Sequence, residues 1–232
     1  MRPSVTQHSD SMSATSGATG VARSASAAGS SVGQLVSSRA LSLWRRLDWR
    51  FLLPDPNLQS VGYFGPSCDL LTALQMFSQS VVVFSDSTLH AAYPEFDLVV
   101  LRHPSPDTVE LAGRMVRPGG SLYLELAGPL RGLSARKVLS RSVVGLVGYA
   151  SALWKLGCDE VQAYWHRPTF EECREIVPIF DRLAMSSVLS RHGPLTAARQ
   201  AKLAMSRSLL HAGLLRYVIP CYSVVAHKKD RS

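Results

Sequence analysis

The sequence predicts an α/β domain with a mostly parallel sheet and helices on both faces. From about residue 58 onward, short apolar runs alternate with helical patterns. Most of these runs are apolar at successive positions, as expected for strands that are covered on both faces. Strands that alternate with helices form parallel sheets, because each helix carries the chain back across the sheet by a right-handed connection.

Four strands and two helices are predicted in the first half of this domain. A strand over 60–65 leads into a helix over 66–79, where Pro66 suits a first helical turn. The elements that follow keep the same alternation: strands over 80–85, 96–101 and 121–126, and a helix over 107–117. The segment Pro118-Gly119-Gly120 is predicted to be the turn before the last of these strands.

The chain is predicted to carry one main domain behind an N-terminal arm. Residues 1–40 are rich in Ser, Ala, Gly and Thr, so they lack the apolar area needed to offset the entropy of ordering, and we expect a disordered arm. A targeting role for this arm is left open. The other expected divisions are a helix and extended loop over 41–57, the α/β domain over 58–228, and helical additions at 139–157 and 194–216.

The charge of the chain bears on the kind of partner that it binds. The 232 residues carry a formal net charge of +8, which favours anionic partners in general. No nucleic-acid recognition motif is readable, however, and nucleic-acid binding is not expected.

The apolar segment 139–156 is too short and too polar at its start to predict a membrane span. We expect it to pack over the sheet, and a peripheral membrane contact stays an alternative. The four cysteines are far apart and form no C-x-x-C pair, so no metal site is predicted and a cytoplasmic protein is expected.

Two motifs in the predicted sheet resemble a known family. The run Phe96-Asp97-Leu98-Val99-Val100, followed by Val116-Arg117-Pro118-Gly119-Gly120, resembles the fourth and fifth strands of class I S-adenosylmethionine-dependent methyltransferases. More loosely, 158–166 and 219–228 resemble the last two strands of that fold, of which the final one is antiparallel. The resemblance implies a Rossmann-like fold and S-adenosyl-L-methionine as cofactor.

The cofactor half departs from the family pattern. The resemblance implies that Gly62 and Gly65 form the cofactor turn, although Tyr63 and Phe64 lie between them and a plain strand-to-helix turn is the alternative. It likewise implies that Asp86 accepts hydrogen bonds from the ribose of the cofactor. The alternative is that Asp86 caps the turn that follows the strand.

The stretch between Asp86 and Phe96 is short. These nine residues leave no room for the family's third strand, which is the edge strand, so we expect a sheet shortened at that edge. In a second alignment, residues 81–84 replace the third strand, the second strand is lost, and Asp86 lies near the adenine amino group.

The remaining candidate site residues follow the predicted strand over 96–101 or stand shortly before Pro168. Arg102 and His103 come directly after that strand, at the sheet edge where ligands bind, so Arg102 is a predicted cofactor contact and His103 a predicted general base. Trp165 and Arg167 are predicted to form one wall of an acceptor pocket. Residues 169–172 have the T-x-x-E spacing of a helix capping box.

Two functions are compatible with these residues. The first is a methyltransferase that acts on a small molecule or on a glycan or natural-product intermediate. Such an enzyme aligns its acceptor with the sulfonium methyl group, so it requires few catalytic side chains. The second is a catalytically inactive methyltransferase-like protein that binds or scaffolds a partner protein in a biosynthetic complex.

Overall fold

The fold is known from a computed structural model, which describes residues 40–84, 95–128, 146–190, 197–212 and 219–230. The predicted arm lies outside these residues except for its last position. The described elements beyond Leu41 belong to one unit, Ser42–Ser232.

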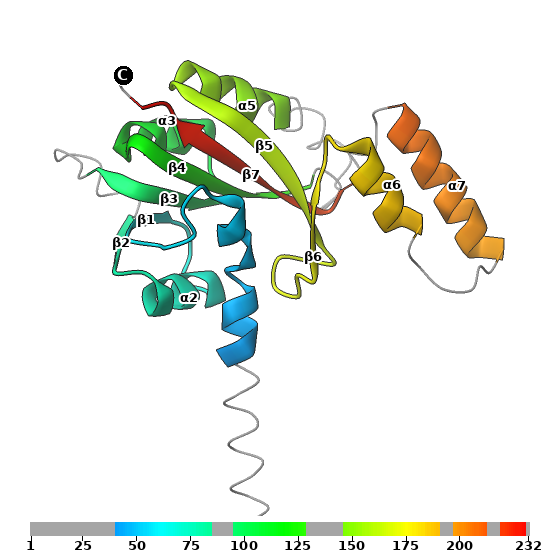
Figure 1. The fold of residues 1–232 in the computed structure, drawn as a ribbon, viewed down its shortest axis with the longest axis horizontal. Coiled ribbons are helices and arrows are strands. Elements are labelled where there is room, and N and C mark those ends of the chain that lie inside the picture. The colour runs from blue at the N-terminus through cyan, green and yellow to red at the C-terminus, as the bar shows by residue number, and fades with distance from the viewer. Residues whose placement is uncertain (1–39, 85–94, 129–145, 191–196, 213–218, 231–232) are drawn as a thin grey trace, which may run out of the picture. The chain divides into compact units, whose positions relative to one another are not determined.

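A seven-stranded sheet in the order β2-β1-β3-β4-β7-β5-β6 forms the centre of this unit (Figure 1). β1, β2, β3 and β4 are mutually parallel, whereas β7 runs antiparallel to both β4 and β5, and β6 is antiparallel to β5. The predicted Rossmann-like fold with an antiparallel C-terminal strand is therefore confirmed. The strands are β1 (Ser60–Phe64), β2 (Ser80–Phe84), β3 (Phe96–Arg102), β4 (Val116–Ala127), β5 (Cys158–Arg167), β6 (Glu175–Pro178) and β7 (Cys221–Lys228).

Helices cover both faces of the sheet, as predicted. The helical elements are residues 40–45, the 3-10 helix η1 (Asp48–Leu52), α2 (Asp69–Phe77), α3 (Pro106–Met115), α5 (Leu146–Lys155), α6 (Arg182–Ser190) and α7 (Ala197–His211). α3 and α5 lie on one face, and α2 lies with the N-terminal helical segment on the other (Figure 1). Ser105 caps α3, because its side chain accepts a hydrogen bond from the Thr108 amide at 3.2 Å.

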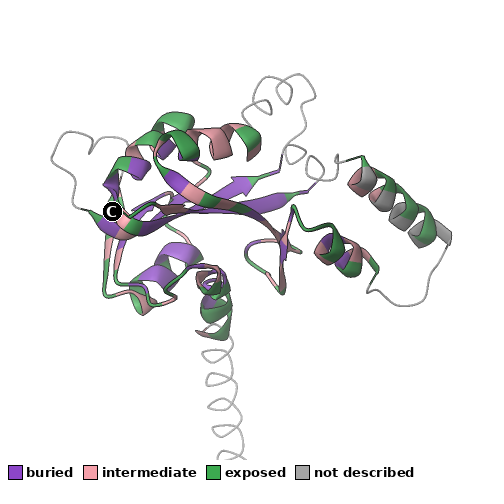
Figure 2. Cartoon of the chain, turned by 45° about the horizontal axis from the view of Figure 1, so that its top comes forward, coloured by how far each residue is buried: buried purple, intermediate pink, exposed green. Residues whose placement is uncertain are grey.

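Alternate residues of each strand contribute to two separate cores. On the α3 and α5 face, Val99, Leu101, Leu122 and Leu124 pack in one cluster with Met115. On the opposite face, Val61, Tyr63, Leu98, Val100 and Tyr123 pack against Leu47, Trp49 and Leu70. Buried residues run along the central strands accordingly (Figure 2). This alternation decides which side chains can meet, because successive residues of a strand point to opposite faces.

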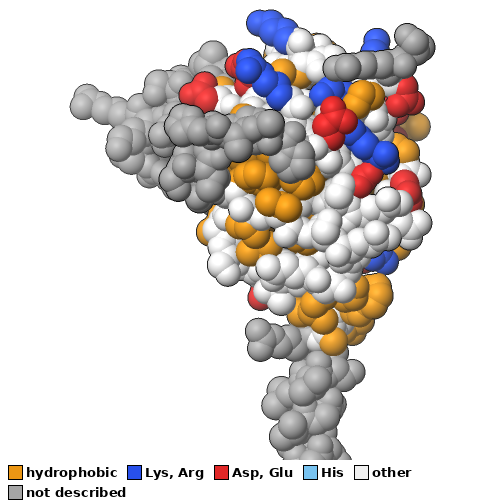
Figure 3. All heavy atoms as spheres, turned by 90° about the vertical axis from the view of Figure 1, so that its left-hand side faces the viewer, with side chains coloured by type: hydrophobic (Ala, Val, Ile, Leu, Met, Phe, Trp, Pro, Cys, Tyr) orange, Lys and Arg blue, Asp and Glu red, His pale blue; other side chains and the backbone are white. Residues whose placement is uncertain are grey.

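β2 ends the sheet on one side. Its residues pair in register with β1 from Ser60↔Ser80 to Phe64↔Phe84, which is the second-strand position of the first alignment proposed above. Among the described residues no strand pairs with the outer side of β2, consistent with a sheet shortened at this edge. Val82 and Val83 are 41% and 46% exposed, and hydrophobic side chains gather on this side of the molecule (Figure 3).

Three details of the sequence prediction are wrong, and two elements were not predicted. Pro66 lies before α2, which begins at Asp69 after Cys68 as its N-cap. Pro118-Gly119-Gly120 is an irregularity within β4, where Gly119 has φ of +73° and the pairing with β3 shifts between Phe96 and Leu98. The T-x-x-E motif starts no helix: Thr169 Oγ1 accepts from the Glu172 amide at 3.2 Å within a turn. The two elements that follow this turn, β6 and α6, were not predicted.

Candidate functional site

The sheet has a topological switch point between β1 and β3. β2 lies on one side of β1 and β3 on the other, and the parallel register pairs Phe64 with Leu101. The chain therefore leaves the carboxyl ends of these two strands in opposite directions. Open α/β sheets bind ligands in the crevice at such a point, so this edge is the candidate site.

The turn after β1 is built tightly around Gly65. A Cβ atom at this position would lie 2.8 Å from Tyr63 Oη and 3.0 Å from Arg102 Cβ, so the space beside the glycine is already used by two side chains of the protein itself. Tyr63 is fully buried, and its hydroxyl donates to the Pro66 carbonyl at 2.9 Å. Gly65 is thus required at the end of β1 for packing of the turn.

Gly62 lies inside β1 rather than in the turn. A Cβ atom there would approach Phe96 Cδ2 at 3.2 Å and Val99 Cγ2 at 3.3 Å. The glycine therefore lets these two side chains pack closely against the strand, on the face opposite to Tyr63. Its predicted cofactor role stays a prediction.

Cys68 stands between this turn and α2. Its Sγ lies 3.4 Å from Tyr63 Oη. Partial burial by itself would raise the pKa of the Cys68 thiol, but contacts with the Tyr63 hydroxyl, the Leu71 and Leu70 amides and the charge of Arg102 outweigh that effect. The pKa is therefore lower than usual, and Cys68 has more thiolate character than an ordinary cysteine.

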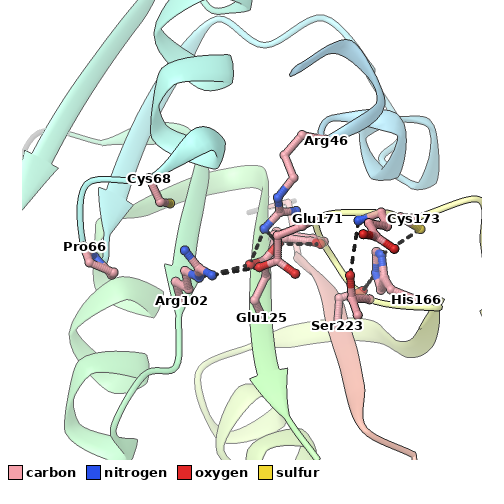
Figure 4. A network of polar contacts seen from close by, with 12 residues as sticks. Arg46, Pro66, Cys68, Arg102, Glu125, His166, Glu171, Cys173 and Ser223 are labelled. Carbon is pink, nitrogen blue, oxygen red and sulfur yellow. Dashed lines mark hydrogen bonds and ion pairs between the residues drawn. The ribbon is translucent and has the colours of Figure 1, made fainter. Parts of the chain in front are cut away.

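Arg102 lies at the end of β3 on the same sheet face as Tyr63 and faces two carboxylates (Figure 4). Its Nη2 lies 3.1 Å from Glu171 Oε1, and its Nε lies 3.7 Å from Glu125 Oε2. That Nε is buried and has no hydrogen-bond acceptor among the described residues. At the switch point, the Nε–H group of Arg102 is therefore a hydrogen-bond donor without an acceptor in the described part of the chain.

Glu125 is a fully buried carboxylate next to Arg102, its register partner across β3 and β4. Arg46 from the N-terminal segment, only 4% exposed, reaches it with Nη2 2.6 Å from Oε1, and Tyr123 Oη donates to the same oxygen at 3.3 Å. Burial alone would lower the pKa of Arg46, but the charge of Glu125 and its hydrogen bond raise it. The Glu125 charge is therefore compensated inside the protein.

A second buried polar group adjoins this pair on the same face. His166 Nε2 lies 2.8 Å from Ser223 Oγ, and its Nδ1 lies 3.5 Å from Cys173 Sγ. Burial, followed by the positive charge of Arg46, lowers the pKa of His166 to about 3. The imidazole is consequently neutral at physiological pH, and the cluster positions strands β5 and β7 rather than carrying a charge.

Of the other predicted site residues, His103 lies beside Arg102, whereas Trp165 and Arg167 lie on the opposite face of the sheet. His103 is exposed with φ of +52°, and its amide donates to the Glu125 carbonyl at 2.8 Å, which places it beside Arg102. Trp165 packs against the core on the α3 and α5 face, and the Arg167 guanidinium lies 4.8 Å from its ring centre. Since Arg102 and Tyr63 lie on the opposite face, the structure does not bring the two groups together. Asp86 lies outside the described residues.

Neither Arg46 nor Glu171 was predicted from the sequence as a site residue, and the contact between Tyr63 Oη and Cys68 Sγ was not predicted either. Arg46 had a readable signal, because it stands three residues after Leu43 and one before Leu47 on the apolar side of a helical segment. Glu171 had none, because a turn between two strands gives no periodic pattern.

A cavity at the opposite edge of the sheet is a weaker candidate. Its volume is about 80 Å³, and its lining includes Asp55, Asp97, Arg117 and Ser121. Arg117 Nη2 lies 2.6 Å from Asp97 Oδ1, and the Ser60 amide donates to Asp97 Oδ2 at 2.9 Å. Arg117 and Asp97 are therefore paired with each other, and the volume is far below that of an ordinary small-molecule pocket.

Two further predictions concern metals and membranes. In the described part of the chain, no group of three His, Cys, Asp or Glu side chains is placed to hold a metal ion. No helix within the described ranges is both long and apolar enough to cross a membrane. The described part of the segment predicted to lie over the sheet, 139–156, is α5, which contacts α3 and β5 and exposes Val147 and Trp154; positions 139–145 lie outside the described residues. Peripheral membrane contact through it stays a prediction.

Comparison with known proteins gives structural neighbours only. No protein-family model and no curated protein sequence matches the chain. A phosphoethanolamine N-methyltransferase 2 from Haemonchus contortus, solved with phosphomonomethylethanolamine and S-adenosylhomocysteine, is 14% identical over 81% of this chain and 53% of its own, with a TM-score of 0.44. The chain thus spans about half the length of this neighbour.

Two other neighbours cover more of their own length. An S-adenosylmethionine-dependent methyltransferase from Thermotoga maritima is 11% identical over 87% of this chain and 95% of its own, with a TM-score of 0.42. A geranyl diphosphate methyltransferase solved with S-adenosylmethionine is 13% identical over 82% of this chain and 85% of its own, with a TM-score of 0.38. The assignment of a class I methyltransferase-like fold rests on the strand order and switch point of this chain itself.

Proposed function

We propose that the chain is an S-adenosylmethionine-dependent methyltransferase-like protein that acts on a small molecule or on a glycan or natural-product intermediate. The observation that carries this proposal is the switch point between β1 and β3, with the cationic Arg102 at its edge. A cofactor with a free carboxylate suits this position, because a guanidinium binds a carboxylate through paired hydrogen bonds.

The described residues fit the amino-acid end of such a cofactor. Arg102 would hold the carboxylate, and the exposed Pro66 and Ser67 of the turn leave this end of the crevice accessible. The predicted ribose contact is Asp86. When bound, S-adenosylmethionine supplies a methyl group on a sulfonium, and the task of the chain is to hold an acceptor in line with it. His103, next to Arg102, is the proposed proton acceptor.

The second candidate function is a non-catalytic binding or scaffolding role in a biosynthetic complex. One observation favours it: the space beside Gly65 is filled by Tyr63 and Arg102 of the chain itself. The same observation gives a direct test, since a protein with no room for the cofactor does not bind it.

Isothermal titration calorimetry of the full chain with S-adenosylmethionine and S-adenosylhomocysteine separates the two functions. We expect micromolar binding that Asp86→Ala abolishes and that Arg102→Ala weakens about tenfold or more, the range for a charged hydrogen bond. Arg114→Ala is the matched control, because Arg114 is exposed and pairs with Glu110 at 2.5 Å across one turn of α3. No detectable binding by well-folded protein would exclude the methyltransferase function and leave the scaffold.

A further inference from the structure

We infer that Glu171 occupies the carboxylate position of the Arg102 site, so that a ligand carboxylate binds there only by displacing it. This inference deepens the proposed function and rests on it. Glu171 is then a built-in competitor that sets how tightly the site holds ligands that carry a carboxylate.

The partners of Arg102 differ in how firmly they are held. Glu125 is fully buried and already receives Arg46 and Tyr123, so it cannot leave. The Glu171 side chain is 49% exposed, and its ion pair with Arg102 is the outer one of the cluster. Exposed ion pairs contribute little free energy, so this one is the contact that a ligand can replace.

The guanidinium of Arg102 is only partly used by Glu171. Nε and Nη2 present their hydrogens along one edge of the group, an arrangement that matches the two oxygens of a carboxylate. Glu171 engages Nη2 at 3.1 Å, whereas the buried Nε has no hydrogen-bond acceptor within the described ranges. A ligand carboxylate that engages both donors gains a hydrogen bond that Glu171 does not make.

The charges of the cluster favour an anion once Glu171 moves away. Arg46, Arg102, Glu125 and Glu171 together are neutral, and loss of Glu171 leaves one positive charge at the switch point. Arg46 cannot follow Glu171 into water, because it is buried and its guanidinium also lies 5.6 Å from the centre of the Phe170 ring. The site therefore selects a negatively charged group of the same kind as the one that it releases.

The turn that carries Glu171 can move without unfolding the sheet. Glu171 lies between β5 and β6, outside the strand pairs, which begin again at Arg167↔Glu175. Glu172 beside it is also exposed, and its amide donates to Thr169 Oγ1. Displacement of the Glu171 side chain therefore requires no break in the β5–β6 pairing.

The test compares two ligands on the full chain by calorimetry. S-adenosylhomocysteine carries the carboxylate, and 5′-methylthioadenosine shares its adenosine and thioether but lacks the carboxylate. We expect Glu171→Gln to bind S-adenosylhomocysteine about three- to fivefold more tightly, the size of an exposed ion pair, with no change for 5′-methylthioadenosine. Glu172→Gln, the neighbouring control, should change neither affinity.

The outcomes distinguish this inference from the proposed function. If Glu171→Gln leaves S-adenosylhomocysteine affinity unchanged or weakens it, the competitor role is wrong while the methyltransferase proposal stands. An equal gain for both ligands also overturns it, because the effect is then a general opening of the site. If neither ligand binds wild type or variant, the inference and the proposed function fail together.

Discussion

The carboxyl edge of the sheet has two parts built from similar residues but with different uses of charge. The inner part consists of Arg46 from the N-terminal segment with Glu125, His166 and Ser223; all four are buried, and their polar atoms form the pairs Arg46–Glu125 and His166–Ser223. The outer part, Cys68, Arg102 and Glu171, is partly exposed, and Arg102 Nε has no hydrogen-bond acceptor among the described residues. The paired charges of the inner part are those of a structural cluster, and the outer part is the one for which we propose exchange of Glu171 for a ligand.

Two adjacent arginine–glutamate ion pairs differ in the same way in their burial. Glu125 pairs with the buried Arg46, while Glu171 pairs with Arg102, whose side chain is 18% exposed. Removal of one partner of a buried pair strands a charge in the protein interior, whereas removal of one partner of an exposed pair leaves the other in water. Proximity in the sheet therefore does not decide whether a charged residue is structural or available; burial does.

The largest expected effect comes from breaking the inner pair. Glu125→Ala should lower the free energy of unfolding by about 3–5 kcal/mol, because Arg46 is left buried without its carboxylate. Urea denaturation of the full chain measures this change. The double variant Arg46→Met, Glu125→Leu should recover much of the loss, and Glu110→Ala on the surface is the control. A loss below about 1 kcal/mol would show that Arg46 reaches water.

The next effect is a dependence of stability on pH that originates at His166. Its pKa is about 3 in the folded protein and 6.5 when exposed, so the folded state binds fewer protons than the unfolded state. The stabilisation is complete above pH 6.5 and is lost as the pH falls toward 3, by about 2 kcal/mol at pH 5. Urea midpoints at pH 7.5 and pH 5 measure it. The difference between wild type and His166→Asn should shrink accordingly at pH 5, and an unchanged difference contradicts the assignment.

A smaller effect is expected at the turn after β1. Tyr63→Phe removes the hydroxyl that donates to the Pro66 carbonyl, which should cost about 1 kcal/mol of stability. The same change should slow alkylation of Cys68 by iodoacetamide, because the hydroxyl that lies beside the thiolate is gone. Mass spectrometry of the labelled peptide reads out the rate. Faster labelling in the variant would mean that Tyr63 mainly shields Cys68.

The smallest change in stability should accompany Arg102→Ala. Glu125 keeps Arg46, and Glu171 is released into water, so we expect a loss of less than about 1 kcal/mol. Denaturation midpoints of Arg102→Ala and Arg114→Ala should then be similar, while only the former loses affinity for S-adenosylhomocysteine. A loss comparable to that of Glu125→Ala would place Arg102 in the inner part instead.

Several strands and helices of this fold could be predicted from the sequence. The runs 80–85 and 96–101 predicted the edge strand β2 and the central strand β3 to within one residue. The second run is apolar at successive positions because β3 is covered on both faces, whereas β2 is partly exposed. The alternation of strands and helices predicted α3, and the resemblance of 219–228 to the last methyltransferase strand predicted the antiparallel β7. Patterns failed where the backbone follows no period, as at Pro118-Gly119-Gly120, which lies within β4, and at the turn that carries Glu171.

The fold class could be predicted from the sequence, because the spacing of apolar residues and the alternation of strands and helices along the chain are local properties. The placement of Arg102 and His103 directly after a predicted strand likewise predicted which sheet edge is the candidate site. Which charges are buried could not be predicted from the sequence and follows from the packing of the folded chain. Arg46 and Glu125 are 79 residues apart, and Arg102 and Glu171 are 69 apart. Their pairing depends on the side of each strand that faces the N-terminal segment, and burial of a charge is a property of all its neighbours together.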